Sequence, residues 1–547
     1  MTLIPRPRSP PAGPDRAALV DLAAAEGHDA DIPSNIGRVP DEKTPHSLTP
    51  DTPVSTGPHG LDKDLEKEAG SAQSSASSVA EPEPTDPNIV DWDGPDDPAN
   101  PQNWSTLRKT GAILIISGFT FLIPLGSSIF APGVPLVMEE FHSHNTLLAG
   151  FVVSVYVLGF AFGPLVIAPL SEMHGRLPLY HASNALFTIF TIACALAPSL
   201  NSLIAFRFIA GAVGAAPLAL GGGTIADVTT REQRATAMSV WMLGPTVGPV
   251  LGPIAGGFIS AGLGWRWNFW VVAIAAGAFG VGGLVLMRET YAPAILAKKA
   301  ARLRKETGNS ALRSKLDSGL APRDLFLFSI VRPTKMLFLS PIVFFLSAYV
   351  ALVYSYLYLM FTTFTDIFLT QYHFAPRLVG LSFVGIGIGA FVGQFGYSWL
   401  ANRDVRKHIA AGTFTPERRL VFMCPGAFLV PIGLFWYGWA VQARVHWICP
   451  IMATVVFGVG LLLIFMPANT YLVDVYTVHA ASAMAANTVL RSIAAAILPL
   501  AGPSMFKALG YGGGGSLLGG FAVVMLPVPF IFLKYGERLR TRFVVKL

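Results

Sequence analysis

Two arginines lie inside long apolar stretches of the sequence, where a charged side chain is costly. Arg207 lies within the apolar block 203–226, and Arg491 lies near the middle of the block 480–503. An arginine at the centre of a membrane helix costs about 3 kcal/mol on insertion scales, so each is expected to face the interior of a helix bundle. Either arginine could bind an anionic ligand in a central cavity. Pairing with backbone carbonyls of a neighbouring helix is the structural alternative.

A second set of charged residues lies at the ends of apolar blocks. The short polar turn 168–178 contains Glu172 and Arg176. Asp227 directly follows the apolar block 203–226. Opposite charges at helix ends on one side of a bundle can form a latch that holds one conformation and is released in another. The alternative is that Glu172 and Arg176 simply cap helix ends and set the orientation of the chain.

Aromatic and amide side chains form a third group of candidates. Tyr354 and Tyr358 are spaced i, i+4 and therefore share one face of a helix. Together with Trp241, Asn487 and Arg491, they could line a cavity for flat, amphipathic molecules. Aromatic residues are also common at membrane interfaces, which is the alternative interpretation.

The sequence offers little support for an enzyme. No nucleophile–base pair lies within an apolar block, and no glycine-rich phosphate loop with a following Lys-Ser/Thr is present. His142 and His144 lie near Glu139 and Glu140, but a solvated loop is favoured over a metal site there. We therefore expect no catalytic residues, no metal and no bound cofactor.

Composition determines the broad class of the protein. Of 547 residues, 52% are hydrophobic and only 13% are charged, and the mean hydropathy is +0.52. Soluble domains carry roughly 25% charged residues, so the chain is expected to be a polytopic membrane protein. Twelve apolar blocks are each long enough to cross a bilayer. They are 110–132, 146–168, 178–198, 203–226, 236–260, 267–287, 336–364, 377–400, 419–441, 447–470, 480–503 and 516–535.

The distribution of charge predicts the orientation and the domain boundaries. Residues 1–107 hold 7 basic and 19 acidic residues, and elsewhere the basic residues gather in alternate connections between blocks. This bias places both termini in the cytosol and gives no indication of nucleic-acid binding. The expected regions are a disordered acidic cytosolic tail (1–107), an N-terminal six-helix half (108–288), a basic cytosolic loop (289–335), a C-terminal six-helix half (336–535) and a basic cytosolic C-terminus (536–547).

The two halves repeat a short pattern in the same chain order. The sequence Ile-Ala-Asp-Val ends the fourth block at Asp227, and Leu-Val-Asp-Val ends the tenth at Asp474. Two parallel six-helix halves predict an all-α fold with a binding site between them near the middle of the membrane, opened alternately to either side.

Several motifs resemble those of the major facilitator superfamily, in particular its fungal twelve-span drug:proton antiporter branch. The turn 168–178 is similar to the loop motif of that family, although Ala168, Met173 and Leu177 depart from it. Arg207-x-x-x-Gly211 resembles its fourth-span motif, and 288–293 (Arg-Glu-Thr-Tyr-Ala-Pro) matches the fungal branch. The antiporter motif is the most specific match: its residues are Gly248, Gly252, Pro253, Gly256 and Gly257.

The resemblance implies a secondary transporter of the plasma membrane. It would export small amphipathic molecules such as drugs, toxins or secondary metabolites in exchange for protons, with Arg207 assisting proton transfer. Its partners would be the small-molecule substrate, protons and the lipid bilayer, and it would act as a monomer driven by the proton gradient, without a cofactor.

Three alternatives to drug efflux stay open at the level of sequence. The same fold could export an organic acid or a polyamine, or act as a nutrient-sensing receptor that transports nothing. The arginines favour anions, whereas the carboxylates (Glu172, Asp227, Asp366 and Asp474) all lie near block ends, which disfavours polycations.

Overall fold

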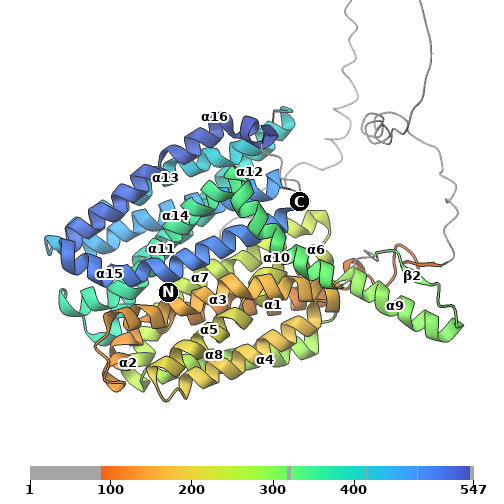
Figure 1. Cartoon of the computed structure of the whole chain (residues 1–547), viewed down its shortest axis with the longest axis horizontal. Coiled ribbons are helices and arrows are strands. Elements are labelled where there is room, and N and C mark those ends of the chain that lie inside the picture. Colours follow the sequence, from red (N-terminus) through yellow and green to blue (C-terminus); the bar gives the residue numbers. More distant parts are fainter. Residues whose placement is uncertain (1–87, 317–321, 414, 477–478, 543–547) are drawn as a thin grey trace, which may run out of the picture. The chain divides into compact units, whose positions relative to one another are not determined.

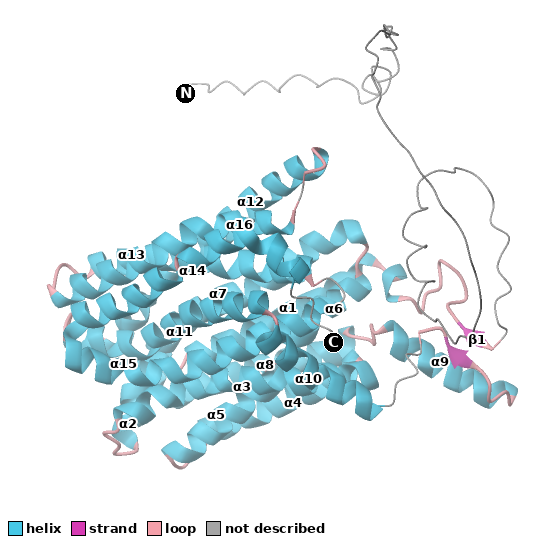
Figure 2. Cartoon of the chain, turned by 45° about the horizontal axis from the view of Figure 1, so that its top comes forward, coloured by secondary structure: helices cyan, strands magenta, loops and turns pink. Residues whose placement is uncertain are grey.

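The computed structural model describes residues 88–316, 322–413, 415–476 and 479–542 of the chain. Contacts divide the chain into residues Met1–Glu81 and residues Pro82–Leu547. The first unit, and with it most of the predicted acidic tail, lies outside the described residues. Within the second unit the described residues are predominantly helical, and a short strand pair lies beside helix α9 (Figures 1 and 2).

The N-terminal half consists of long helices joined by short connections. Local sequence explains where several of them begin: the Asn145 side chain accepts hydrogen bonds from two backbone amides at the start of α3, and Ser199 forms a capping box with Ser202 at the start of α5. The elements are α1 (Thr106–Ser128), η2 (Ala131–Gly133), α2 (Val134–Glu140), α3 (Thr146–His174), α4 (Arg176–Ala195), α5 (Leu200–Gly214), α6 (Ala216–Val228), α7 (Arg231–Leu263) and α8 (Arg266–Leu286).

The C-terminal half repeats this arrangement. Its elements are α11 (Pro341–Thr370), η3 (Pro376–Phe383), α12 (Val384–Ala410), η4 (Pro416–Phe422), α13 (Met423–Gln442), α14 (Ile448–Val475), α15 (Ala480–Met525) and α16 (Pro527–Arg542). The predicted seventh block, 336–364, is displaced from α11. The Ser340 side chain caps α11 and Pro341 occupies its first turn, so the preceding residues belong to a separate helix.

Eleven helical stretches among the described residues are long and apolar enough to cross a membrane. The last of them, Ala480–Arg542, has 63 residues and covers both the eleventh and the twelfth predicted block. Gly510 inside α15 has φ 70° and ψ 172°, which breaks the helical path between those two blocks. The fold is thus the expected all-α arrangement of twelve spans.

The connection between the halves, predicted as a basic loop at 289–335, contains helices α9 (Ala292–Thr307) and α10 (Pro322–Leu339). The predicted disordered segment 1–107 is also wrong for its last part. Ile89–Val90 (β1) pairs in parallel with Arg313–Ser314 (β2), and Pro101–Asn103 (η1) precedes α1. Acidic composition predicted disorder there, but lysines on the connection between the halves neutralise these acidic residues.

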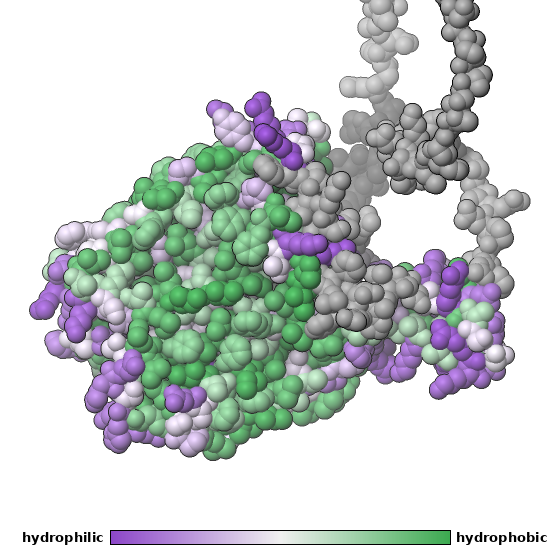
Figure 3. Space-filling view, viewed as in Figure 1, coloured by the Kyte–Doolittle hydropathy of each residue, from purple (hydrophilic) through white to green (hydrophobic). Residues whose placement is uncertain are grey.

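Helices pack along one another within each half, and several elements pack across the boundary between the halves. In the N-terminal half α1 packs along α7, and α4 along α8. Across the halves α3 packs on α15 and α7 packs on η3. The flanks of the helices are apolar, and hydrophilic residues gather towards the helix ends (Figure 3). Val285 in α8, for example, is 77% exposed, as expected for a side chain that faces lipid.

Candidate functional site

One end of the helix bundle carries an ion pair in each half; we call it the basic end. It is the end where α1, α4 and α11 begin and α6 and α14 finish. In the N-terminal half Arg176 Nε lies 2.6 Å from Asp227 Oδ2, which brings together two of the residues singled out in the sequence. Glu172 is exposed, and its carboxylate is attracted electrostatically to Arg176 and Arg332.

Glu289, in the Arg-Glu-Thr-Tyr-Ala-Pro motif, also belongs to this cluster, and no pattern in the sequence indicated its role. Its carboxylate accepts hydrogen bonds of 3.0 Å from the backbone amides of Arg176 and Leu177, at the start of α4. A carboxylate is favoured at a helix N-terminus because the first amides there have no helical partner. Gly175 has φ 89°, and a Cβ at this position would collide with the Glu289 carboxylate.

The C-terminal half has the corresponding ion pair. Arg419 Nε lies 2.9 Å from Asp474 Oδ2, where α14 finishes beside the start of α13. Asp474 was recognised as the counterpart of Asp227, but Arg419 was not singled out. In both halves an arginine before the third span therefore binds an aspartate at the end of the fourth span.

Arg207 lies on α5 in the interior of the N-terminal half and is 1% exposed. Its Nη2 donates hydrogen bonds to the carbonyls of Ser127 (3.1 Å) and Val153 (3.4 Å), whereas Nε and Nη1 have no hydrogen-bond partner. The guanidinium carbon also lies 4.9 Å from the ring centre of Phe130 and 5.2 Å from that of Tyr156. Carbonyls and aromatic faces thus replace water around this charge.

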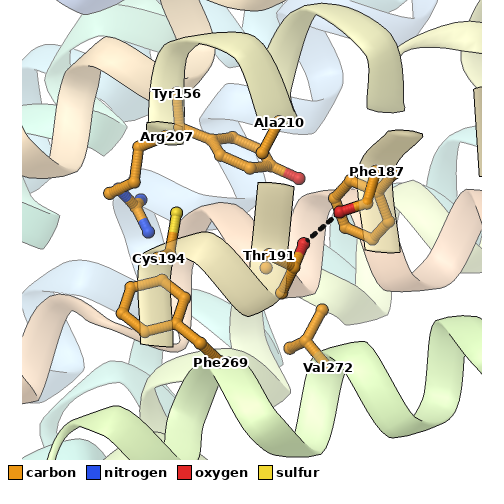
Figure 4. Close-up of a pocket in the computed structure, with 9 residues that line it drawn as sticks. Tyr156, Phe187, Thr191, Cys194, Arg207, Ala210, Phe269 and Val272 are labelled. Carbon is orange, nitrogen blue, oxygen red and sulfur yellow. Dashed lines mark hydrogen bonds between the residues drawn. The ribbon is translucent and has the colours of Figure 1, made fainter. Parts of the chain in front are cut away.

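A small cavity adjoins Arg207, with room for about one water molecule. The thiol of Cys194 and the rings of Tyr156 and Phe269 surround the guanidinium, and Thr191 lies beside Cys194 on α4 (Figure 4). The Thr191 hydroxyl donates to the Phe187 carbonyl at 2.6 Å. All residues that line the cavity come from the N-terminal half, so it is an internal cavity of that half.

The antiporter-motif glycines place helix backbones in direct contact. A Cβ on Gly248 would lie 2.9 Å from the Phe121 carbonyl oxygen, and one on Gly252 would lie 2.9 Å from the Ile129 amide nitrogen. A Cβ on Gly256 would collide with the Ile129 carbonyl. No larger residue fits at these positions unless α1 and α7 separate.

The motif continues across the boundary between the halves. A Cβ on Gly257 would lie 3.1 Å from the Gly380 amide nitrogen of η3, and the Pro253 carbonyl faces the same glycine. This contact lies at the opposite end of the bundle from the Arg176–Asp227 ion pair. The stripe on α7 therefore closes the two halves against each other at that end.

The predicted cavity residues fall into separate places. Tyr354 and Tyr358 lie together on α11 with ring centres 5.3 Å apart, and Arg491 lies 4.6 Å from the ring of Tyr354. Trp241 is not with them: its indole donates to Thr120 at 2.8 Å inside the N-terminal half. Asn487 is buried and donates to Asn469 of α14 at 2.7 Å.

Ser127 is the residue that connects these regions, and no pattern in the sequence singled it out. Its carbonyl accepts from Arg207, and its hydroxyl lies 3.0 Å from the Tyr358 hydroxyl across the boundary between the halves. Tyr358 in turn contacts Tyr354, over whose ring Arg491 lies. A continuous series of contacts thus joins the two intramembrane arginines.

Comparison with known proteins agrees with this geometry. Residues 116–499 match the family model of the Major Facilitator Superfamily. The chain is 54% identical to the MFS-type transporter penM of Penicillium rubens, over 83% of this chain and 90% of that protein. It is 52% identical to the efflux pump radE of Floropilus chiversii, over 85% of this chain and 87% of that protein.

A solved structure shows the same fold. The partially occluded, inward-open form of the xylose transporter XylE from E. coli superposes with a TM-score of 0.59 at 16% identity, over 79% of this chain and 98% of that chain. At that identity the likeness concerns the fold alone. The family match and the two fungal relatives, which cover most of both chains, establish the rest: the chain belongs to the major facilitator superfamily and is a multi-span membrane transporter.

Proposed function

We propose that this transporter exports small amphipathic molecules in exchange for protons, by alternating access between its two halves. The observation that carries the proposal is the glycine stripe of α7, which packs backbone to backbone on α1 and reaches Gly380 across the half boundary. Because α7 makes both contacts, opening of the Gly257–Gly380 contact between the halves would also shift the packing of α7 on α1 within the N-terminal half. The name of the relative radE, an efflux pump, supports export over uptake.

The proposed orientation has the basic end and both termini in the cytosol, with the chain in the plasma membrane. The concentration of Lys and Arg on α9, with Lys298, Lys299, Arg302, Arg304 and Lys305, supports this orientation. The closed contact at Gly257 and Gly380 would then face outwards, so the conformation corresponds to an inward-facing state.

In the proposed cycle, 108–288 and 336–535 rock as two bodies joined by the connection 289–335. The ion pairs Arg176–Asp227 and Arg419–Asp474 would hold α4 to α6 and η4 to α14 at the basic end during this motion. Glu172, exposed beside Arg176, would complete the latch in the outward-facing state, when the basic ends of the two halves approach each other.

We place the proton-coupling step at Arg207. Its Nε and Nη1 have no hydrogen-bond partner and the adjoining cavity has room for about one water molecule, so the residue is placed to bind a water there. Entry and release of this water would change what Arg207 binds, and through Ser127 would act on the contact between the halves. No ATP or bound cofactor enters the proposal, and one chain is sufficient for the cycle.

Two measurements test this function. First, collapsing the pH gradient is expected to stop efflux of the compounds that cells lacking this gene retain, as identified by untargeted mass spectrometry. Depleting ATP while the gradient is clamped is expected to leave efflux intact. Efflux that follows ATP and ignores the gradient would refute proton antiport.

Second, Gly256→Val is expected to reduce efflux at least about tenfold, because its side chain would force α7 away from α1. Gly262→Val is the matched control on the same helix, since a Cβ there meets nothing within 4 Å. Equal efflux by the two variants, at equal amounts in the membrane, would remove the stripe from the mechanism.

A further inference from the structure

Arg491 has an environment that leaves its positive charge uncompensated. Its guanidinium carbon lies 4.6 Å from the ring centre of Tyr354 and 5.1 Å from that of Phe465. Its Nε is buried without a hydrogen-bond partner. Aromatic faces stabilise a cation, but they carry no net negative charge that could neutralise it.

The described carboxylates of the spans do not form an ion pair with Arg491. Asp227 and Asp474 are bound to Arg176 and Arg419 at the basic end, and Glu417 lies beside Arg540. The middle of the C-terminal half thus holds a net positive charge. Burying such a charge without a counter-ion is unfavourable unless a ligand supplies the negative charge during the cycle.

Arg491 lies nearer the basic end than the contact between Ser127 and Tyr358, and it is partly exposed. Tyr358 and Ser127 are fully buried where they meet across the halves. Tyr354 lies one helical turn nearer the basic end on the same face of α11, and Tyr354, Phe465 and Arg491 are all partly exposed. These three residues therefore lie on the basic-end side of the Ser127–Tyr358 contact, and none of them is fully buried.

From this arrangement we infer that Arg491 binds an ionised acidic group of the exported molecule, a carboxylate or an enolate, while the flat apolar part of that molecule packs on Tyr354 and Phe465. The guanidinium offers several N–H donors in one plane, which suits the two oxygens of such a group. The inference rests on the proposed function, because it assigns the substrate class of the same central site.

The same geometry disfavours other substrates. A polyamine would need carboxylates in place of Arg491, and the described residues around this guanidinium are aromatic. A neutral molecule could pack on the two rings, but it would leave the guanidinium uncompensated. Acidic amphipathic molecules are therefore the class that this site fits.

A pair of fluorescent probes tests the inference directly. Pyrenebutyrate and pyrenebutanol share one flat apolar part and differ in the carboxylate. Their binding to the purified full-length chain in nanodiscs is measured by fluorescence titration at neutral pH. We expect the acid to bind at least about tenfold more tightly than the alcohol, because only the acid gives Arg491 a counter-ion.

Variants assign that preference to one residue. Arg491→Gln is expected to bring the affinities of acid and alcohol within about twofold of each other, and Arg491→Lys is expected to keep part of the preference because it keeps the charge. Arg406→Gln, which removes an exposed positive charge on α12, is the matched control and is expected to behave as the unmodified chain.

Each outcome decides the question. Equal affinities of acid and alcohol for the unmodified chain would overturn the inference, and so would a preference that survives in Arg491→Gln. If Arg491→Gln does not fold, the ratio in the unmodified chain and in Arg491→Lys decides instead. These results are independent of the efflux assays: export without an acid preference refutes the inference alone, and an acid preference without gradient-driven export refutes the proposed function.

Discussion

The two intramembrane arginines occupy contrasting environments, although both lie over aromatic rings. Arg207 is enclosed within one half, where the carbonyls of Ser127 and Val153 accept its protons. Arg491 lies in the other half, is partly exposed, and contacts Tyr354 and Phe465. A closed environment fixes the position of a charge, whereas an open one leaves the charge available to a ligand.

This contrast distinguishes two roles, proton coupling and substrate recognition, that the sequence alone does not distinguish. From the chain alone, Arg207 and Arg491 look alike, as single arginines in apolar blocks that could each bind an anion. The structure gives Arg207 backbone partners, which was the structural alternative, and still leaves Nε and Nη1 free towards a small cavity. This difference supports the proposal that Arg207 takes part in coupling and Arg491 in substrate recognition.

The largest effect is expected for Arg207→Ala. Removing the guanidinium leaves two buried carbonyls without their donor and empties the centre of the N-terminal half, so efflux should fall at least about a hundredfold. Because a buried, uncompensated charge is itself costly, the protein should still reach the cell surface in amounts within about twofold. Efflux per surface molecule is the measurement. Unchanged efflux would remove Arg207 from the mechanism.

Lysine substitutions distinguish the two environments. Lysine keeps the charge but loses the planar fork of donors. At position 207 this should cost at least about tenfold in efflux, because one ammonium cannot reproduce the hydrogen bonds and the ring contacts together. At position 491 the loss should stay within about threefold if attraction to an anion is what matters. Efflux measured for both variants in the same cells tests this, and equal losses would contradict the division of tasks.

Much of the fold could be predicted from the sequence because a bilayer imposes simple rules. Apolar blocks of about 20 residues and the alternation of basic connections indicate twelve spans and two halves. The predictions were wrong where contacts distant in sequence, or a helix-start signal, override composition. The segment 88–105 was predicted as part of the disordered tail because it is acidic, although lysines distant in sequence bind it. Residues 336–340 were assigned to the seventh span although Pro341 starts a new helix.

The site was only partly predictable because sequence position indicates which end of the bundle a residue lies at, but not which direction its side chain takes. Asp227 and Arg176 could be paired because helix ends place them on one side of the bundle, and the structure brings them together. Trp241 could not be placed, since its direction depends on the rotation of α7, a helix with prolines at positions 245, 249 and 253. Ser127 and Phe465 were missed because a serine or a phenylalanine in an apolar block carries no distinguishing signal.

The contact between the two regions gives a third, smaller effect. Ser127→Ala and Tyr358→Phe each remove the hydroxyl–hydroxyl contact that joins the halves. A neutral hydrogen bond contributes about 1 kcal/mol, so each variant should change efflux by about twofold to tenfold. The double variant should resemble either single variant if the hydroxyls act through each other. Additive losses in a double-mutant cycle would show that the two regions are not coupled by this contact.

The smallest effect is expected at the segment 88–105. Amide exchange at its strand pair tests whether this segment, instead of the arginine regions, responds to pH. A hydrogen bond from Lys315 lowers the pKa of Asp91, and backbone amides of Asp93 and Ala99 lower that of Asp97. A lowered pKa in the folded state gives stability that is present above the ordinary value, about 3.9, and is lost as the pH falls through the folded value. The protection factors of the Arg313 and Lys315 amides, which donate to the Asn88 and Val90 carbonyls, should therefore be unchanged between about pH 5 and pH 8 and should fall only in stronger acid. In Asp91→Asn the exchange should quicken by at most a few fold at every pH, because exposed ion pairs contribute little. Protection factors that changed across the neutral range would move the proton response from the arginine regions to this segment.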